Sequence, residues 1–305
     1  MTRKIKLSHC RRRVLLALLL ALAAPAGVLA MEVKVFAIGD FVPSGSGGCG
    51  GGDRSHWPTM VDKWYDKMGS KGHTKDGQYT NGNMTIRRFC DPDWNSGCRD
   101  YNYIDEADAA MIATHGSDSG DHWQGTMRFR WSGHCALDAG GSADDMWVGD
   151  WDLEFIHVSS CYSADDDNLP GIREAMYDPY DSPPTGRRAH QWDGFHGIMW
   201  IGSSFDSDYR EFANDAHSVA MARSWVSNMY DGTVDCAWYD PWNVFGTCQE
   251  QCPVAYTIGT TASDALTRLY YERYNNVYSD PTDRDWYAYR YIVNCDSVGE
   301  TAFNP

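Results

Sequence analysis

Two short apolar blocks, each followed by a reactive side chain, constrain the fold of this chain most strongly. The first block, 109–114, precedes His115 and Gly116, and the second, 153–160, precedes Cys161. Each block has the length of a buried strand, and polar, turn-forming residues follow it at once. If the blocks form neighbouring parallel strands, both reactive groups lie at carboxyl ends, where open α/β sheets hold their ligand crevices.

The amino terminus has the three parts of a secretory signal peptide. A head with six basic residues precedes an apolar run over 14–24, and V-L-A at 28–30 offers a cleavage site. The apolar run is shorter than the roughly 20 residues that span a bilayer. We therefore predict a signal peptide over 1–30, a secreted or periplasmic protein and no stable membrane insertion after cleavage. An uncleaved anchor is the alternative.

The charge balance argues against nucleic acid as a partner. The chain has 26 basic and 42 acidic residues, and loss of the leader would change its net charge from −16 to −22. Such a surface repels phosphate backbones. The remaining residues, 31–305, are enough to bury a large core, and we predict that they form a single α/β domain.

The cysteines after the leader are odd in number, so at least one of them is free or pairs between chains. An exported protein is expected to oxidise its structural cysteines. Cys161 is the candidate for the free thiol, because it alone ends an apolar block beside a polar loop. The others are Cys49, Cys90, Cys98, Cys135, Cys236, Cys248, Cys252 and Cys295. Cys90 with Cys98, and Cys248 with Cys252, are close enough for local loops, but the pairing itself stays open.

Further strands and helices alternate along the chain and predict a mostly parallel sheet with helices on both faces. We expect disulfide-stapled loops at its surface. Predicted strands cover 31–38, 198–202, 253–257 and 286–293, and predicted helices cover 58–68, 208–229 and a segment that begins at Thr261. The glycine-rich segment 45–53 and the segments 70–108 and 170–188 are predicted to be loops, of which 45–53 could border the active site.

A cysteine nucleophile needs a neighbouring base, because an ordinary thiol with a pKa of about 8.5 is only slightly ionised at neutral pH. Neighbouring strands lie about 4.8 Å apart, so His115 would be within reach of Cys161. His115 could accept the thiol proton or remain as imidazolium beside the thiolate. The backbone N–H groups of Gly116 and Cys161 could then bind an oxyanion.

The two blocks resemble the caspase–legumain–gingipain group of cysteine peptidases. The similarity rests on A-M-I-A-T-H-G, which ends at Gly116, and F-I-H-V-S-S-C, which ends at Cys161. The resemblance implies a caspase-like α/β sandwich that hydrolyses polypeptides through a thioester, with Cys161 as nucleophile, His115 as proton-transfer residue and no cofactor. The second block departs from the apolar pattern of the group at Glu154 and His157.

Three polar residues outside the dyad are candidates for substrate binding. Asp165 follows the nucleophile closely, and Asp193 is a second acidic candidate. Because members of the group that cleave after Arg or Lys need an acidic pocket, either residue could select a basic side chain. His196 precedes the apolar block at 198–202 and could line the same crevice. His157 lies in the middle of its block, where a core hydrogen bond is the expected role.

Two other functions compete with the peptidase. The chain has 13 tryptophans, several of them beside aspartate, as in exported proteins that bind or cleave sugars. A catalytically inactive binding protein is a further alternative, and most of the tryptophans would then serve packing. The spacing of cysteines, histidines and carboxylates matches no familiar metal motif, so we predict no metal site.

Overall fold

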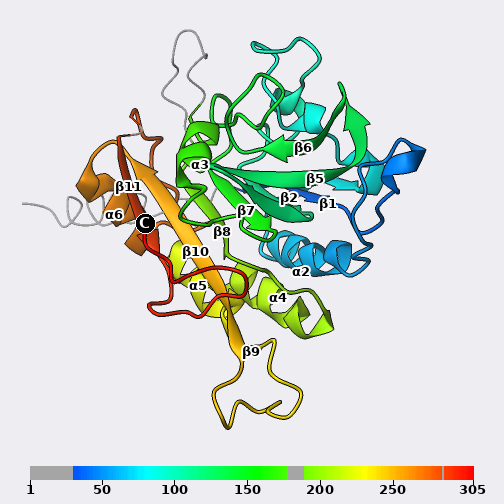
Figure 1. The fold of residues 1–305 in the computed structure, drawn as a ribbon. Helices are drawn as coiled ribbons and strands as arrows, with labels where there is room; N and C mark the ends of the chain where they lie inside the picture. Colours follow the sequence, from blue (N-terminus) through cyan, green and yellow to red (C-terminus); the bar gives the residue numbers. More distant parts are fainter. Residues whose placement is uncertain (1–29, 178–188, 284) are drawn as a thin grey trace, which may run out of the picture.

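The computed structural model describes residues 30–177, 189–283 and 285–305 (Figure 1). The predicted signal peptide therefore lies outside the described residues, apart from Ala30. Within the described ranges, no helix is long and apolar enough to cross a membrane.

A mainly parallel sheet forms the centre of the molecule, as the sequence predicts. Its strands follow the order β2–β1–β3–β7–β8–β10–β11, and neighbouring strands are parallel from β2 to β8. β10 runs antiparallel to β8, to β11 and to the short β9. The strands are β1 (Glu32–Ala37), β2 (Thr74–Thr80), β3 (Ala109–Ala113), β7 (Phe155–Ser159), β8 (Gln191–His196), β9 (Asp231–Val234), β10 (Gln249–Gly259) and β11 (Trp286–Arg290).

Helices form a continuous row against the sheet, in which each helix packs on the next (Figure 1). In order, the row contains α2 (Trp57–Ser70), α4 (Asp206–Asp215), α5 (Met221–Met229) and α6 (Ala262–Tyr271). A smaller antiparallel sheet and α3 (Leu169–Ala175) pack on the opposite face, where Trp123 contacts Trp192 of β8 with ring centroids 6.1 Å apart. The smaller sheet consists of β4 (Gly116–Ser119), β5 (His122–Trp131) and β6 (His134–Asp138).

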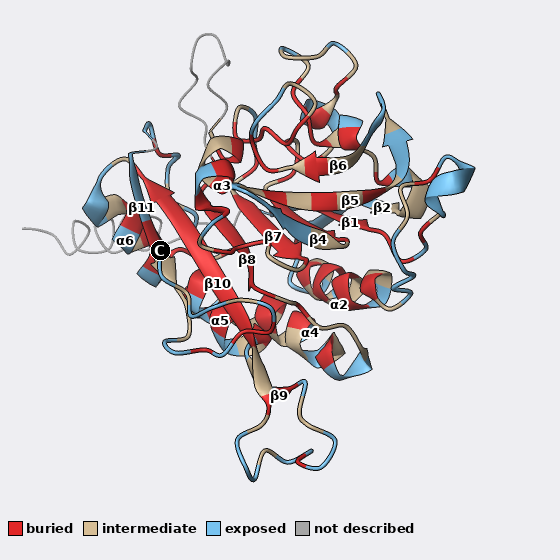
Figure 2. Cartoon of the chain, in the orientation of Figure 1, coloured by how far each residue is buried: buried red, intermediate tan, exposed pale blue. Residues whose placement is uncertain are grey.

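The apolar blocks form the most deeply buried strands. All five residues of β3 and all five of β7 are buried, and the central strands are red along their length in Figure 2. The side chains of β7 alternate between the two faces of the sheet. His157 packs against Phe212 on the helical face, whereas Ser160, just beyond the strand, accepts a hydrogen bond from Trp123 of the smaller sheet. Cys161 therefore follows on the helical side.

Four sequence-based assignments of secondary structure are wrong. β2 lies in a segment predicted to be a loop, because this strand is at the edge of the sheet and has mostly polar residues. The predicted loop 170–188 contains part of α3, and the predicted helix 208–229 is two helices, interrupted before Met221. The apolar block 198–202 is not a strand, since β8 lies before it at Gln191–His196.

Four disulfides staple the loops, and among the described cysteines Cys161 is the free one, as predicted. The local pair of Cys90 and Cys98 is confirmed, but the suggested pair of Cys248 and Cys252 is wrong. Four residues of extended chain span about 13 Å, which is too far for a disulfide. The remaining pairs are Cys49–Cys135, Cys236–Cys248 and Cys252–Cys295.

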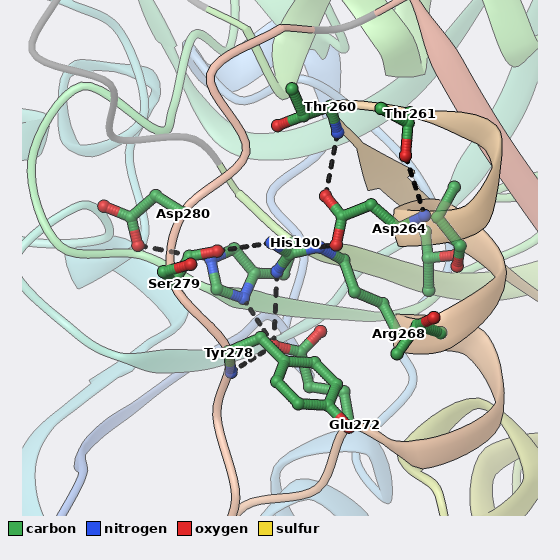
Figure 3. A network of polar contacts seen from close by, with 12 residues as sticks. His190, Thr260, Thr261, Asp264, Arg268, Glu272, Tyr278, Ser279 and Asp280 are labelled. Atoms are coloured by element: carbon green, nitrogen blue, oxygen red, sulfur yellow. Dashed lines mark hydrogen bonds and ion pairs between the residues drawn. The ribbon is translucent and has the colours of Figure 1, made fainter.

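A buried polar network fixes α6 to the sheet at the residue before β8 (Figure 3). His190 Nδ1 lies 2.8 Å from Glu272 Oε1, and Arg268 Nη1 donates to the same carboxylate oxygen at 3.3 Å. Thr261 caps the helix by accepting a hydrogen bond from the backbone N–H of Asp264 at 3.1 Å, as the sequence predicts. The network holds the C-terminal part of the chain against the amino-terminal edge of the parallel strands.

Candidate active site

The register of β3 and β7 brings the two reactive side chains to one edge of the sheet. Ala113 of β3 pairs with Ser159 of β7, and the two strands are parallel neighbours. His115 and Cys161 each follow two residues after this last pair. Both therefore leave the sheet at its carboxyl-terminal edge, which is the usual position of a ligand crevice in an open parallel sheet.

His115 and Cys161 line the same pocket, whose volume is about 480 Å3. This size is in the range of small-molecule and side-chain binding sites. The other lining residues come from the start of α2, from the segment before it and from the loop after β8. They are Arg54, Trp57, Ile198, Met199, Trp200 and Ile201.

The imidazole of His115 is held in one orientation by the glycine-rich loop and by aromatic rings. Its Nε2 donates a hydrogen bond to the carbonyl oxygen of Gly52 at 2.7 Å, and the rings of Phe41 and Trp57 lie with their centroids 4.8 Å and 5.0 Å from it. Because a carbonyl oxygen only accepts, Nε2 carries the proton in the neutral ring. Nδ1 is then the nitrogen with a free lone pair, which is available to accept a proton.

The thiol of Cys161 is half-buried and contacts the backbone of the pocket wall. The N–H of Met199 donates to Sγ at 3.4 Å, and Sγ lies 3.8 Å from the carbonyl oxygen of the same residue. Burial raises the pKa of the Cys161 thiol, and the hydrogen bond from Met199 offsets part of this effect. The thiol is therefore protonated at neutral pH.

His115 is also held in its neutral form. Burial lowers the pKa of His115, the hydrogen bond to Gly52 opposes that change, and the positive charge of Arg54 lowers the pKa further. A raised thiol pKa and a lowered imidazole pKa in one pocket favour the neutral form of both groups. Of the two states that the sequence left open for His115, these shifts favour the neutral imidazole, which is the form that can accept a proton.

Gly116 lies where no side chain fits. A Cβ atom at this position would be 2.2 Å from the carbonyl oxygen of Cys161 and 2.2 Å from Oγ of Ser160. Gly116 also begins β4, where it pairs with Gly125 of β5. The missing side chain lets the backbone after His115 approach the backbone of Cys161, which is the arrangement that a shared oxyanion site requires.

Asp165 and His196 contact each other and do not line this pocket. Oδ2 of Asp165 lies 3.0 Å from Nδ1 of His196, and Nε2 of His196 donates to the carbonyl oxygen of Thr301 at 2.7 Å. Both side chains are buried. Although burial opposes it, this ion pair raises the pKa of His196 and lowers the pKa of Asp165.

Asp193 lies in the core, also outside the pocket. Its Oδ2 accepts a hydrogen bond from Nδ1 of His157 at 2.7 Å, and its two oxygens accept from Nε2 of Gln191 at 2.7 Å and 2.9 Å. Nε2 of His157 lies 2.7 Å from the hydroxyl of Tyr274. Both nitrogens of His157 are thus engaged in core hydrogen bonds, the role expected from its place in the middle of the strand.

Sequence reasoning missed the pocket wall, although one signal was present. The block I-M-W-I at 198–201 has the composition of a buried strand, but a glycine stands on each side of it. Gly197 has a φ of +74°, and a Cβ there would be 2.6 Å from the carbonyl oxygen of Val298, so the chain turns sharply. Flanking glycines are typical of a loop that turns at both ends.

Three groups of residues among those described place potential metal ligands within 4.8 Å of one another. In the first, Glu250 adjoins two cysteines that form a disulfide. The second contains the ion pair of Asp165 and His196 with Asp166, and the third consists of carboxylates alone. The three groups, in this order, are Glu250, Cys252 and Cys295; Asp165, Asp166 and His196; and Asp108, Asp152 and Glu154. None of these residues lines the pocket of Cys161, and we assign no metal to any of the three groups.

Comparison with known proteins gives one family match. The model of a domain of unknown function, DUF6345, matches residues 49–291, which include both reactive side chains and the pocket wall. Searches of the curated proteins and of the solved structures found no significant match.

Proposed function

We propose that this chain, which belongs to the DUF6345 family of unknown function, is a cysteine peptidase of caspase-like architecture with Cys161 as nucleophile and His115 as acid and base. The observation that carries the proposal is the shared pocket. The free cysteine and a histidine with one uncommitted ring nitrogen leave neighbouring parallel strands at the same edge and line the same cavity. A thiol and a base in this arrangement are the minimum for nucleophilic catalysis.

The reaction starts from a neutral pair. As Sγ of Cys161 attacks the carbonyl carbon of a peptide bond, Nδ1 of His115 takes the thiol proton. The oxyanion that forms is stabilised by the backbone N–H groups of Gly116 and Cys161. His115 then gives its proton to the departing amine, which leaves a thioester on Cys161. Water, activated by His115, hydrolyses the thioester and restores the thiol.

The charge in the pocket favours a neutral or acidic substrate side chain. The two acidic residues suggested by the sequence, Asp165 and Asp193, are paired elsewhere. The lining residues include one cation, Arg54, which among the described residues donates to the carbonyl oxygen of Asp53 and makes no ion pair. A guanidinium without a carboxylate partner disfavours a basic substrate group and attracts an acidic one.

Two tryptophans of the wall offer further contacts to a peptide. Nε1 of Trp57 and Nε1 of Trp200 are buried and have no hydrogen-bond partner among the described residues. A buried indole N–H normally finds an acceptor. A peptide carbonyl in the pocket would supply one.

The decisive experiment combines turnover with thiol mapping. Incubation with a diverse peptide library should give cleavage by the wild-type protein and none by Cys161→Ala. For variants of His115, the matched control is His134→Ala, which changes an exposed histidine. Iodoacetamide should label Cys161 in the non-reduced protein, and the rate should rise with pH above the ordinary thiol value of about 8.5 because the resting thiol is protonated. Cleavage that persists in Cys161→Ala would show that the nucleophile is assigned wrongly.

A further inference from the structure

The connection between β9 and β10 projects from the body of the molecule (Figures 1 and 2). It exposes a cluster of large apolar side chains. Trp238 is 90% exposed and Trp242 is 83% exposed. We call this segment the aromatic loop, residues 236–248. Its other exposed apolar residues are Tyr239, Val244 and Phe245. So many large apolar side chains on one short segment indicate a contact with something outside the chain.

The aromatic loop has a fixed shape. The disulfide between Cys236 and Cys248 closes it at its base. In its middle, the carboxylate of Asp240 accepts hydrogen bonds from the backbone N–H groups of Val244 and Phe245. A loop ordered in this way presents its apolar side chains without further loss of conformational freedom on binding.

The polar groups of the loop are turned inward. Asp240 is 2% exposed and also accepts a hydrogen bond from the hydroxyl of Thr247 at 3.0 Å. Asn243 accepts one from the N–H of Cys248 at 3.1 Å. Between the two cysteines, Asp240 is the sole residue that carries a charge at neutral pH. The exposed surface of the aromatic loop is therefore mainly apolar and uncharged, and the backbone N–H groups from Asn243 to Cys248 are hydrogen-bonded within the loop.

We propose that the aromatic loop docks the protein onto a zwitterionic lipid surface by inserting Trp238, Trp242 and Phe245 into the interfacial layer. Tryptophan and tyrosine are favoured at this depth, and apolar neighbours extend into the acyl region. Internal hydrogen bonds leave fewer backbone N–H groups unpaired when the loop enters a low-dielectric layer. A sugar would need free polar side chains beside the rings, but the carboxylate of Asp240 and the amide oxygen of Asn243 accept hydrogen bonds from the backbone of the loop. The net charge, which is −16 for the whole chain and −22 without the leader, opposes anionic lipids, so neutral headgroups are the expected surface.

The position of the aromatic loop relates docking to the pocket. Cys252 of β10 pairs with His196 of β8 in the antiparallel register, so the start of β10 adjoins the carboxyl-terminal end of β8. The aromatic loop, which precedes β10, thus projects from the same edge of the sheet as His115 and Cys161. In addition, Gln251 at the base of the loop accepts a hydrogen bond from the N–H of Trp200 in the pocket wall at 2.8 Å. A docked molecule would turn the pocket edge toward the lipid surface.

Flotation with large phosphatidylcholine vesicles tests the proposal on the full mature chain. We expect the wild-type protein to float with the vesicles and to show a blue shift of its tryptophan emission. Trp238→Ala/Trp242→Ala should bind at least about tenfold more weakly, because it loses the two most exposed rings. Trp286→Ala, which removes a half-exposed tryptophan from β11, should bind like the wild type. Thermal unfolding of each variant checks that the fold is kept.

Three results would overturn the proposal. The first is no flotation of the wild-type protein with phosphatidylcholine vesicles. The second is equal flotation of the wild type and the double variant. The third is a different ligand for the aromatic loop. In that case the wild type would form a dimer in sedimentation or be retained on insoluble cellulose or chitin, the double variant would do neither, and neither protein would bind vesicles. None of these results bears on peptide cleavage, since the variants leave His115 and Cys161 unchanged.

Discussion

The two ends of β3 and β7 differ in a way that separates the proposed catalytic arrangement from a structural one. At their carboxyl-terminal ends, the strands deliver His115 and Cys161 to a common pocket. At their amino-terminal ends, the same strands begin beside Asp108 and Glu154, which with Asp152 form a cluster of carboxylates. Both ends are partly buried, so both groups of ionisable side chains lose hydration.

Burial moves the groups at both ends toward their neutral forms, but the consequence differs. At the amino-terminal end, burial and the neighbouring carboxylates raise the pKa of Glu154 to about 10, and burial raises the pKa of Asp108 to about 6. Groups of the same kind can only repel one another or share protons. At the carboxyl-terminal end, a thiol and an imidazole line the same pocket, and in the proposed reaction a proton passes from one to the other. Burial would thus support proton transfer only where an acid and a base share a pocket.

The largest expected effect is at His115. His115→Ala should lower kcat/KM for peptide cleavage by about 10³-fold, in the range found when a general acid–base is removed. Its free energy of unfolding should change by less than about 1 kcal/mol, because the ring is at the surface of the pocket. Steady-state kinetics and urea unfolding measure the two quantities, and His134→Ala should alter neither. If His115→Ala keeps its activity, His115 is not the acid–base residue, and the carboxyl-terminal ends of β3 and β7 have no proposed catalytic role that the amino-terminal ends lack.

His157 lies on β7, the strand that leads to Cys161, and should show the opposite pattern. His157→Ala removes a partner of the buried Asp193 carboxylate and leaves the Tyr274 hydroxyl without its acceptor. Loss of one partner of a buried charge costs roughly 3–5 kcal/mol. We expect a correspondingly lower midpoint in urea, with kcat per folded molecule close to that of the wild type. A stable but inactive variant would instead place His157 in the reaction.

Gly116 tests the close approach at the carboxyl-terminal end. In Gly116→Ala, the new methyl group meets the backbone of Cys161, so the backbone must shift at a cost of about 1–3 kcal/mol in unfolding free energy. Since the shift moves the proposed oxyanion donors, kcat should fall as well. Gly45→Ala is the matched control, because a Cβ there meets nothing within 4 Å. Equal stability and activity in both variants would contradict the packing argument.

The sequence predicted the parts of the fold that depend on local apolar patterns. The apolar composition of two blocks predicts β3 and β7. The odd number of cysteines predicts a free thiol, at Cys161, and short-range hydrogen bonding predicts the helix cap at Thr261. The partners of Asp165 and Asp193 did not follow, because they come from distant segments. His196 is the neighbour of Asp165, but its ring is also held by Thr301, more than 100 residues away. The position of an acidic residue in the sequence therefore does not show with which group its carboxylate forms an ion pair or a hydrogen bond.

The smallest expected effect is at the amino-terminal end, where the acidic cluster should make stability depend on pH. Because the pKa of Glu154 is raised to about 10 from an ordinary value of 4.5, the folded state keeps a proton that the unfolded state releases. The stability that this proton contributes is therefore present in full below about pH 4.5 and is lost as the pH rises toward 10.

Glu154→Gln replaces the neutral acid with a neutral amide. It should match the wild type at pH 5 and exceed it by more than about 1 kcal/mol at pH 8 in urea unfolding. Glu211→Gln, on the exposed surface of α4, should show no such gain, and kcat/KM should be unchanged in both variants. If the wild type and Glu154→Gln lose stability in parallel as the pH rises, the proton is held elsewhere in the cluster, and Asp108, with its pKa of about 6, is the next residue to replace.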